Sequence, residues 1–217
     1  NSTIEHSYGF GVYSETGSNL DMLNNTLDDI SSNGVHVSDL VTGVATGGSI
    51  EIRGNTISNV GTTSYPMYIS DSVDGLTGLN LITDNVGVNN AKNLIYLYLT
   101  VSGELGLDAS NQMDWGGYYN VGSGDTLTLS PGAVVKASSI YVSGGTLNAQ
   151  GTVSEPIVFT SVNDHAYGSG TTGTGTPAKK DWNCISLSNG GSAVLDYTVV
   201  RYAGATTCNH IVDNASI

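Results

Sequence analysis

Charged side chains are scarce in this chain of 217 residues. They make up 12% of the sequence, only six of them are basic, and the formal net charge is -13. Nucleic acids bind proteins through clustered lysine and arginine side chains that displace the counterions of the phosphate backbone. We therefore expect no nucleic-acid partner. Because charges are so few, Ser, Thr, Asn and Gly must form most of the surface.

Long hydrophobic runs are also missing. A membrane-spanning helix needs about 18 consecutive apolar residues, whereas the most apolar stretch, residues 94–101, is only as long as a β-strand. The sequence therefore predicts no insertion into a membrane. It contains no cationic, hydrophobic signal segment either, and we expect that such a segment was removed or that the chain is a piece of a longer protein.

The most regular pattern is an Asn-Thr-aliphatic phrase. It occurs as Asn1-Ser2-Thr3-Ile4, Asn25-Thr26-Leu27 and Asn55-Thr56-Ile57, so its threonines are 23 and then 30 residues apart. The phrase Gly11-Val12-Tyr13 likewise returns 23 residues later as Gly34-Val35-His36. Short β-type runs at such a period are typical of a solenoid in which each repeat is one coil of strands.

The asparagines of this phrase have a structural interpretation. When Asn stands at the same corner of successive parallel coils, each side-chain amide can bond to the next, and every bond contributes about 0.5–1.5 kcal/mol. We therefore interpret Asn1, Asn25 and Asn55 as corner residues that keep the coils in register, rather than as ligands.

Only two cysteines are present, Cys184 and Cys208, separated by 24 residues. A zinc site needs four ligands, and the four histidines are scattered, so zinc is not expected. The separation matches one coil, and stacked strands lie about 4.8 Å apart. A disulfide between neighbouring coils is therefore predicted, with two buried free thiols as the alternative.

Residues 115–204 carry a second set of phrases, which run in the order TLTLSPGAVVK (126–136), IYV (140–142), GTLNAQGT (145–152), PIVFTS (156–161), DWNCISL (181–187) and LDYTVVRYAG (195–204). This order resembles that of secreted right-handed parallel β-helix proteins of bacteria and archaea, and the Asn-Thr-Ile coils look like the repeats that usually follow such a unit. The resemblance implies an all-β, right-handed parallel β-helix at an extracellular or cell-surface location. One departure, Asn183-Cys184 where small residues are usual, favours the disulfide.

We therefore expect residues 1–217 to form one continuous β-helix. Residues 1–114 would supply the Asn-rich coils, and residues 115–217 a second unit with an inserted loop at 163–180.

Catalytic residues are not evident. A glycoside hydrolase on this scaffold needs carboxylates about 5–9.5 Å apart in one groove, but the only adjacent pair, Asp28-Asp29, points to opposite faces of a strand. Arg53 and Lys92 lie apart from any acidic cluster that could support a lyase. An ice-binding solenoid would repeat a Thr-x-Thr array, whereas residues 126–128 supply one such step.

The inserted loop is the best candidate for an ion site. Asn163, Asp164 and Asp181 bracket it, and calcium takes oxygen ligands of this kind, although a solvated loop can also carry them. Asn1, Asn24 and Asn214 begin glycosylation tripeptides, which also arise by chance in a chain of this composition.

The function expected from these features is that of a non-catalytic extracellular structural or adhesive module. Repeat sequence lies at both ends, so we expect the chain to stack end to end with copies of itself in a filament or to continue into a larger surface protein, with glycans as further partners. The alternatives are a polysaccharide lyase or glycoside hydrolase and a carbohydrate-binding solenoid. No cofactor is expected other than calcium.

Overall fold

The computed structural model describes residues 1–15, 18–38, 50–71, 81–170 and 173–205. Within these ranges every assigned element is a β-strand, and the paired strands run parallel in four sheets. The expectation of an all-β chain with parallel sheets is therefore confirmed. No helix in the described ranges is long and apolar enough to cross a bilayer.

The sheets, here named A to D, have the following strands. Sheet A contains β1 (Thr3–Ser7), β4 (Thr26–Ile30), β7 (Thr56–Val60) and β10 (Val86–Val88), and sheet C contains β3 (Leu20–Leu23), β6 (Ile50–Arg53) and β9 (Ile82–Thr83). Sheet B is the largest, with β2 (Val12–Glu15), β5 (Val35–Ser38), β8 (Met67–Asp71), β11 (Leu94–Val101), β13 (Asp114–Val121), β15 (Val134–Ser143), β17 (Ile157–Phe159), β20 (Thr198–Val200) and β18 (Ile185–Ser188), which pairs with β15. Sheet D contains β12 (Glu104–Leu107), β14 (Thr126–Leu129), β16 (Thr146–Gln150) and β19 (Ser192–Asp196).

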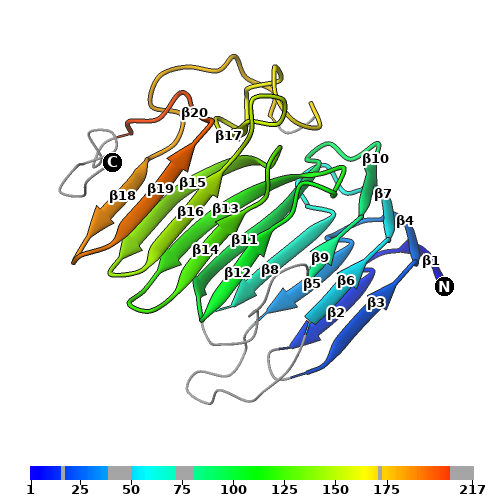
Figure 1. The fold of residues 1–217 in the computed structure, drawn as a ribbon. Helices are drawn as coiled ribbons and strands as arrows, with labels where there is room; N and C mark the ends of the chain where they lie inside the picture. Colours follow the sequence, from blue (N-terminus) through cyan, green and yellow to red (C-terminus); the bar gives the residue numbers. More distant parts are fainter. Residues whose placement is uncertain (16–17, 39–49, 72–80, 171–172, 206–217) are drawn as a thin grey trace.

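Consecutive strands belong to different sheets in a recurring order. From β1 to β9 the chain visits sheets A, B and C three times, and each strand pairs with the strand one circuit later (Figure 1). The register joins Thr3 to Thr26 and Thr26 to Thr56, as the repeat predicts. After β10, sheet D follows sheet B in place of sheet C, and sheet A gains no further strand in the described residues. The predicted division at residues 114 and 115 stays a prediction.

The hydrophobic core runs between the sheets as columns of aligned side chains. In sheet B one such column passes through Val35, Met67, Ile95, Trp115, Val135 and Phe159, all of which are buried. The later strands contribute to the same core: Ile140, Val142, Leu147, Ile157, Phe159 and Ile185 belong to it, and Leu187 packs against it. Each buried aliphatic or aromatic side chain contributes about 1.5–3 kcal/mol.

Left-handed backbone at two aligned positions explains part of the Asn, Asp and Gly content. One column contains His6, Asp29 and Asn59 within strands of sheet A and Asn89 directly after β10, with φ between 53° and 56°. The other immediately precedes sheet A and contains Asn24, Gly54 and Asp84. Asn, Asp and Gly adopt this conformation at lower cost than other residues, so each coil turns its corners in the same way.

The predicted asparagine ladder is confirmed at the corner between sheets C and A. Asn25, Asn55 and Asn85 each donate a side-chain hydrogen bond to Oδ1 of the Asn one coil later, at 2.9–3.1 Å, and the ladder ends at Asn111. The backbone N–H of the same three residues donates to the same oxygen. Because Asn55 and Asn85 are fully buried, these bonds replace water that cannot reach the corner.

The assignment of Asn1 to this ladder is wrong. The pairing of Thr3 with Thr26 places Ser2, not Asn1, next to Asn25, and the Ser2 N–H donates to Asn25 Oδ1 at 2.9 Å. The Asn1 side chain is exposed, and its terminal amine lies 3.5 Å from the Leu23 carbonyl oxygen. The sequence phrase has one extra residue at its first occurrence, so the asparagine falls one position outside the corner.

Replacing Asn55 by Ala tests the ladder. The substitution removes bonds to Asn85 Oδ1 and to the Met22 and Arg53 carbonyl oxygens, and leaves buried groups without partners. We expect unfolding in denaturant to require about 2–3 kcal/mol less free energy. Asn148→Ala is the matched control, because that half-buried amide accepts its bond from Gln150 on the surface and should change stability by less than about 0.5 kcal/mol. Equal losses in the two variants would contradict the ladder.

Candidate functional site

A row of aromatic side chains occupies the outer face of sheet B. Tyr13, His36, Tyr68 and Tyr96 hold equivalent positions on β2, β5, β8 and β11. Their rings contact one another in sequence, with centroids 5.0–5.6 Å apart. The Tyr13–His36 pair is tilted and the other two pairs are stacked, and such ring pairs each contribute about 0.5–1.5 kcal/mol. The row arises because parallel pairing in register repeats the same side-chain position once per coil.

A second row continues from the first toward the later coils. Tyr98 is two residues beyond Tyr96 on β11 and aligns with Tyr118 on β13, with ring centroids 5.1 Å apart. The next ring, Tyr141 on β15, lies 5.5 Å from Tyr118 after a register shift between Gly117 and Tyr118. Tyr98 is 52% exposed and Tyr13 43% exposed. We call these two rows on the outer face of sheet B the tyrosine face.

Both aromatic and polar side chains border these rings: Phe10 lies 4.3 Å from the His36 ring and Tyr65 lies 4.5 Å from the Tyr96 ring. The other outward positions of β5, β8, β11 and β13 beside the rings carry Ser38, Ser70, Thr100, Gly116 and Asn120. The Tyr13 and Ser38 hydroxyl groups lie 3.0 Å apart, and Asn120 Nδ2 donates to Thr100 Oγ1 at 3.5 Å. Charged groups stand at the borders: Glu15 on β2, and Lys92, whose Nζ is 4.7 Å from the centre of the Tyr65 ring.

His36 is the one histidine within the rows. Burial lowers its pKa below the usual value of 6.5. Asn33 defines the tautomer, because Asn33 Oδ1 accepts from the Tyr65 N–H while Asn33 Nδ2 lies 2.8 Å from His36 Nδ1. Nδ1 is therefore the acceptor, and the neutral ring carries its proton on Nε2.

A buried ion pair marks the other part of the same outer face. Lys136 Nζ lies 2.9 Å from Asp114 Oδ2, and the two side chains are 0% and 4% exposed. Both residues occupy outward positions, one coil apart on β15 and β13, where solvent would be expected. They are buried because the segment between β17 and β18 crosses over the sheet at this point.

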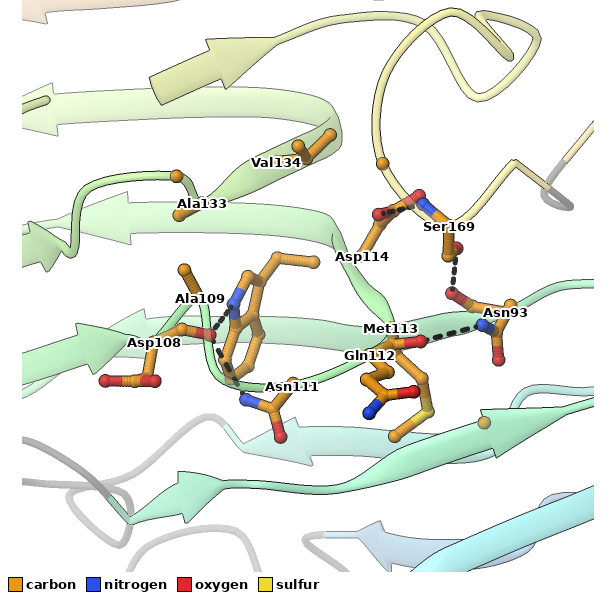
Figure 2. Close-up of a pocket in the computed structure, with 14 residues that line it drawn as sticks. Asn93, Asp108, Ala109, Asn111, Gln112, Met113, Asp114, Ala133, Val134 and Ser169 are labelled. Carbon is orange, nitrogen blue, oxygen red and sulfur yellow. Dashed lines mark hydrogen bonds between the residues drawn. The ribbon is translucent and has the colours of Figure 1, made fainter. Parts of the chain in front are cut away.

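Ser169 attaches this segment to the sheet (Figure 2). Its backbone N–H donates to Asp114 Oδ1 at 2.8 Å and its hydroxyl group to Asp114 Oδ2 at 3.1 Å. A side chain at Gly168 would collide with the Asp114 carboxylate, 2.1 Å from the position of a Cβ. The carboxylate of Asp114 therefore binds both the loop and Lys136, and the close approach of the loop requires glycine.

A cavity of about 440 Å³ lies beside this attachment. It is lined by the turn from Asp108 to Asp114, by Gly132–Val134 and by Ser169, and Figure 2 shows Asp108 and Gln112 at its wall. The Trp115 indole N–H and the Asn111 amide both donate to the Asp108 carbonyl oxygen, at 3.0 and 3.2 Å. The cavity lies where sheet A ends, next to the last residue of the asparagine ladder.

The carboxylates at this cavity do not form an acid–base pair. Asp114 is bound by Lys136 and Ser169, and Asp108 Oδ1 accepts from the Ser110 N–H at 2.7 Å. The sequence pair Asp28-Asp29 is also divided between partners: Asp28 accepts from Ser58 and Asn59, and Asp29 lies 2.7 Å from His6. The Ser58 and Asn59 hydrogen bonds lower the pKa of Asp28.

The predicted calcium ligands are only partly brought together. Asn163 Nδ2 donates to Asp181 Oδ2 at 3.3 Å, while Asn163 Oδ1 accepts from the Gly175 N–H. Asp164 instead accepts from Thr160 at 2.7 Å and lies 3.4 Å from Arg201. The Ser161 hydroxyl group, and then the Ala178 and Asn163 N–H groups, lower the pKa of Asp181. These oxygens already have protein donors, and calcium binding stays a prediction.

The remaining predicted sites are tested only in part. Cys184 is buried, but Cys208 lies outside the described residues, so the disulfide stays a prediction. Asn1 and Asn24 are exposed, as glycosylation requires, and Asn214 lies outside the described residues. Sequence reasoning missed the tyrosine face and the Asp114–Lys136 pair.

Comparison with known proteins adds no relative. No protein family, curated protein or solved structure matches the chain significantly. The parallel all-β architecture is compatible with the resemblance found in the sequence, but a secreted, bacterial or archaeal origin gains no support from these comparisons. Functional inference therefore rests on the geometry of the outer face and of the cavity.

Removing the buried cation should destabilise the protein. In Lys136→Met the Asp114 carboxylate keeps Ser169 but loses its counter-charge, which should lower the free energy of unfolding by about 3–5 kcal/mol. The double variant Asp114→Asn/Lys136→Met should recover most of this loss, because no buried charge remains and the amide oxygen can still accept from Ser169. Denaturant titration measures both. A single variant as stable as the unsubstituted protein would show that the pair is not buried in solution.

The surroundings of His6 and His36 predict pKa shifts in opposite directions. The hydrogen bond and charge of Asp29 raise the pKa of the exposed His6, whereas burial lowers that of His36. Since unfolded His36 takes up a proton near pH 6.5 and native His36 only at lower pH, stability contributed at this site should fall as the pH drops below 6.5. NMR titration of both rings in one sample measures this. A pKa for His36 at or above that of His6 would contradict the arrangement.

Proposed function

We propose that the chain is a right-handed parallel β-helix that acts outside the cell as a non-catalytic structural or adhesive module. The observation that carries the proposal is sheet B, in which eight strands from β2 to β20 follow one another without a break in hydrogen bonding. Such an array is extended and regular, so it offers length and repeated surface rather than an enclosed reaction site.

The order of strands supports the helical path. Three circuits through sheets A, B and C, each paired in parallel with the next, require the chain to advance by one strand spacing per circuit, about 4.8 Å. The asparagine ladder runs in the same direction and bonds each circuit to the following one. A right-handed path is the usual one for parallel crossover connections.

End-to-end contact is supported by the first coil. β1, β2 and β3 are the outermost strands of sheets A, B and C, and their second edges have no strand beside them in the described residues. Ile4, Val12 and Leu20 on these strands pack against the core but are only partly buried. A further coil, from another copy or from the rest of a larger surface protein, would satisfy the backbone groups and bury these side chains.

An extracellular location and glycan partners are consistent with the surface. Its outer positions carry hydroxyl and amide groups, and Asn24 is exposed for glycosylation. A disulfide between Cys184 and Cys208 would also belong to an oxidising compartment. A polysaccharide-cleaving enzyme has less support, because Asp28, Asp29 and Asp114 each engage different protein partners and do not converge on one groove.

Self-association tests the structural role. Sedimentation of the chain should show an average mass that rises with concentration. Leu20→Lys, which places a charge on the open apolar end, should weaken association by about tenfold or more. Leu23→Lys is the matched control: it changes the same residue type on the same strand, but at a position 42% exposed. A monomeric mass at every concentration, or equal weakening in both variants, would contradict stacking through the first coil.

A further inference from the structure

We propose that the tyrosine face binds a neutral polysaccharide laid along the direction in which the coils stack. This inference deepens the adhesive role proposed above and rests on it, since it assigns the adhesive surface and the chemical class of its partner. The surface consists of Tyr13, His36, Tyr68, Tyr96, Tyr98, Tyr118 and Tyr141 with the hydroxyl and amide groups beside them.

The first argument is the choice of tyrosine. The chain has 12 tyrosines and only two phenylalanines, and along β11 and β13 tyrosines face outward where a purely structural sheet surface could carry threonine or valine. Tyrosine offers a rigid ring and a hydroxyl group at low conformational cost, which suits contact with a ligand that is apolar on its faces and polar on its rim. Sugar rings have that character, with C–H groups on the faces and hydroxyl groups around the edge.

The second argument is preorganisation. Because neighbouring rings already stack, with planes inclined by only 6° between Tyr68 and Tyr96 and by 27° between Tyr98 and Tyr118, little side-chain freedom remains to be lost on binding. The stacked rings repeat once per coil, at about the strand spacing of 4.8 Å. A periodic surface of this kind matches a periodic polymer better than a compact ligand.

The third argument is charge. On a chain of net charge -13, the outward positions of β5, β8, β11 and β13 carry a single charged side chain, Asp114, and it is buried against Lys136 under the loop. An acidic polysaccharide or a nucleic acid would meet no exposed cation on these positions and would be repelled by the rest of the surface. A neutral polymer needs no counter-charge, and burying it desolvates no charged group on these four strands.

The position of the loop is consistent with this surface. The segment held by Ser169 on Asp114 covers the beginnings of β11, β13 and β15, where Leu94 and Lys136 are buried. Tyr98 and Thr100, which lie further along β11, remain exposed. The outer face therefore has one region that the loop covers and another region that is free for a ligand.

Retention on insoluble polysaccharides tests the proposal. The full chain should sediment with a panel of neutral polymers, namely cellulose, chitin, xylan and mannan, and should bind at least one of them. It should not sediment with gels of polygalacturonate, which is acidic. No retention on any neutral polymer, or equal retention on polygalacturonate, would overturn the inference.

Two variants locate the binding. Tyr98→Ser/Tyr118→Ser should weaken retention by about tenfold or more, because two aromatic contacts are lost. Tyr197→Ser, which removes a tyrosine that is 53% exposed outside these rows, is the matched control and should bind as the unsubstituted protein does. Thermal unfolding of each variant shows whether the fold is retained.

A charge at the rim gives a second readout that leaves the stacked rings in place. Thr100→Glu on sheet B should abolish retention, whereas Thr26→Glu, an exposed threonine on a strand of sheet A, should leave it unchanged. Retention unaltered by both Thr100→Glu and the double tyrosine variant would place binding elsewhere and overturn the assignment. These assays do not depend on self-association. Glycan binding can therefore be contradicted while end-to-end stacking holds, and stacking can be contradicted while glycan binding holds.

Discussion

Register between successive coils is the constraint on which the rest of this structure depends. In a parallel sheet a shift of one residue sends every side chain to the opposite face, so a single slip would expose the core of one coil and bury its polar side chains. The asparagine corner opposes such a slip, because Asn25, Asn55, Asn85 and Asn111 can bond to one another only when they are aligned. The Oδ1 atoms of Asn55, Asn85 and Asn111 each accept from both the backbone and the side chain of the preceding asparagine, which ties the sheet to the corner.

The features of the outer face follow from the same register. Aligned positions bring aromatic rings of successive strands into rows, and they place Lys136 on one coil near Asp114 on the preceding one. The register shift of one residue after Gly117 pairs Tyr141 with Asn120, and the Tyr141 ring lies 5.5 Å from that of Tyr118. The face is therefore a direct product of coil alignment, and its uncharged character comes from which residues occupy those aligned positions.

Much of the architecture could be predicted because it is local and periodic. The repeat of Gly11-Val12-Tyr13 at Gly34-Val35-His36 indicated a period of 23 residues, and the structure pairs Tyr13 with His36 at that spacing. The error at Asn1 came from counting the phrase by its first letter, whereas the aligned threonines place Ser2 at the corner. Twelve tyrosines against two phenylalanines were a signal of aromatic side chains at half-exposed positions that could have been used.

Other parts could not be read from the sequence, because they depend on contacts without a period. The cavity exists because sheet A ends at β10 and a loop from residues 168–169 lies across the following strands. The burial of Asp114 and Lys136 requires that loop, and its attachment uses the backbone N–H of Ser169, which every residue except proline possesses. The calcium prediction could not take account of a contact of this kind either: Asp164 forms an ion pair with Arg201, which is distant in the sequence.

Native-state hydrogen exchange at the corner tests the central claim most directly. The backbone amides of Asn25, Asn55 and Asn85 lie outside the strands but donate to the asparagine oxygen of the next coil. The account predicts that the amides of Asn55 and Asn85 exchange as slowly as those of the core strands β7 and β11, and that they open only with global unfolding. Exchange at the rate of exposed turns, with the flanking strands still protected, would show that the corners do not hold the coils in register.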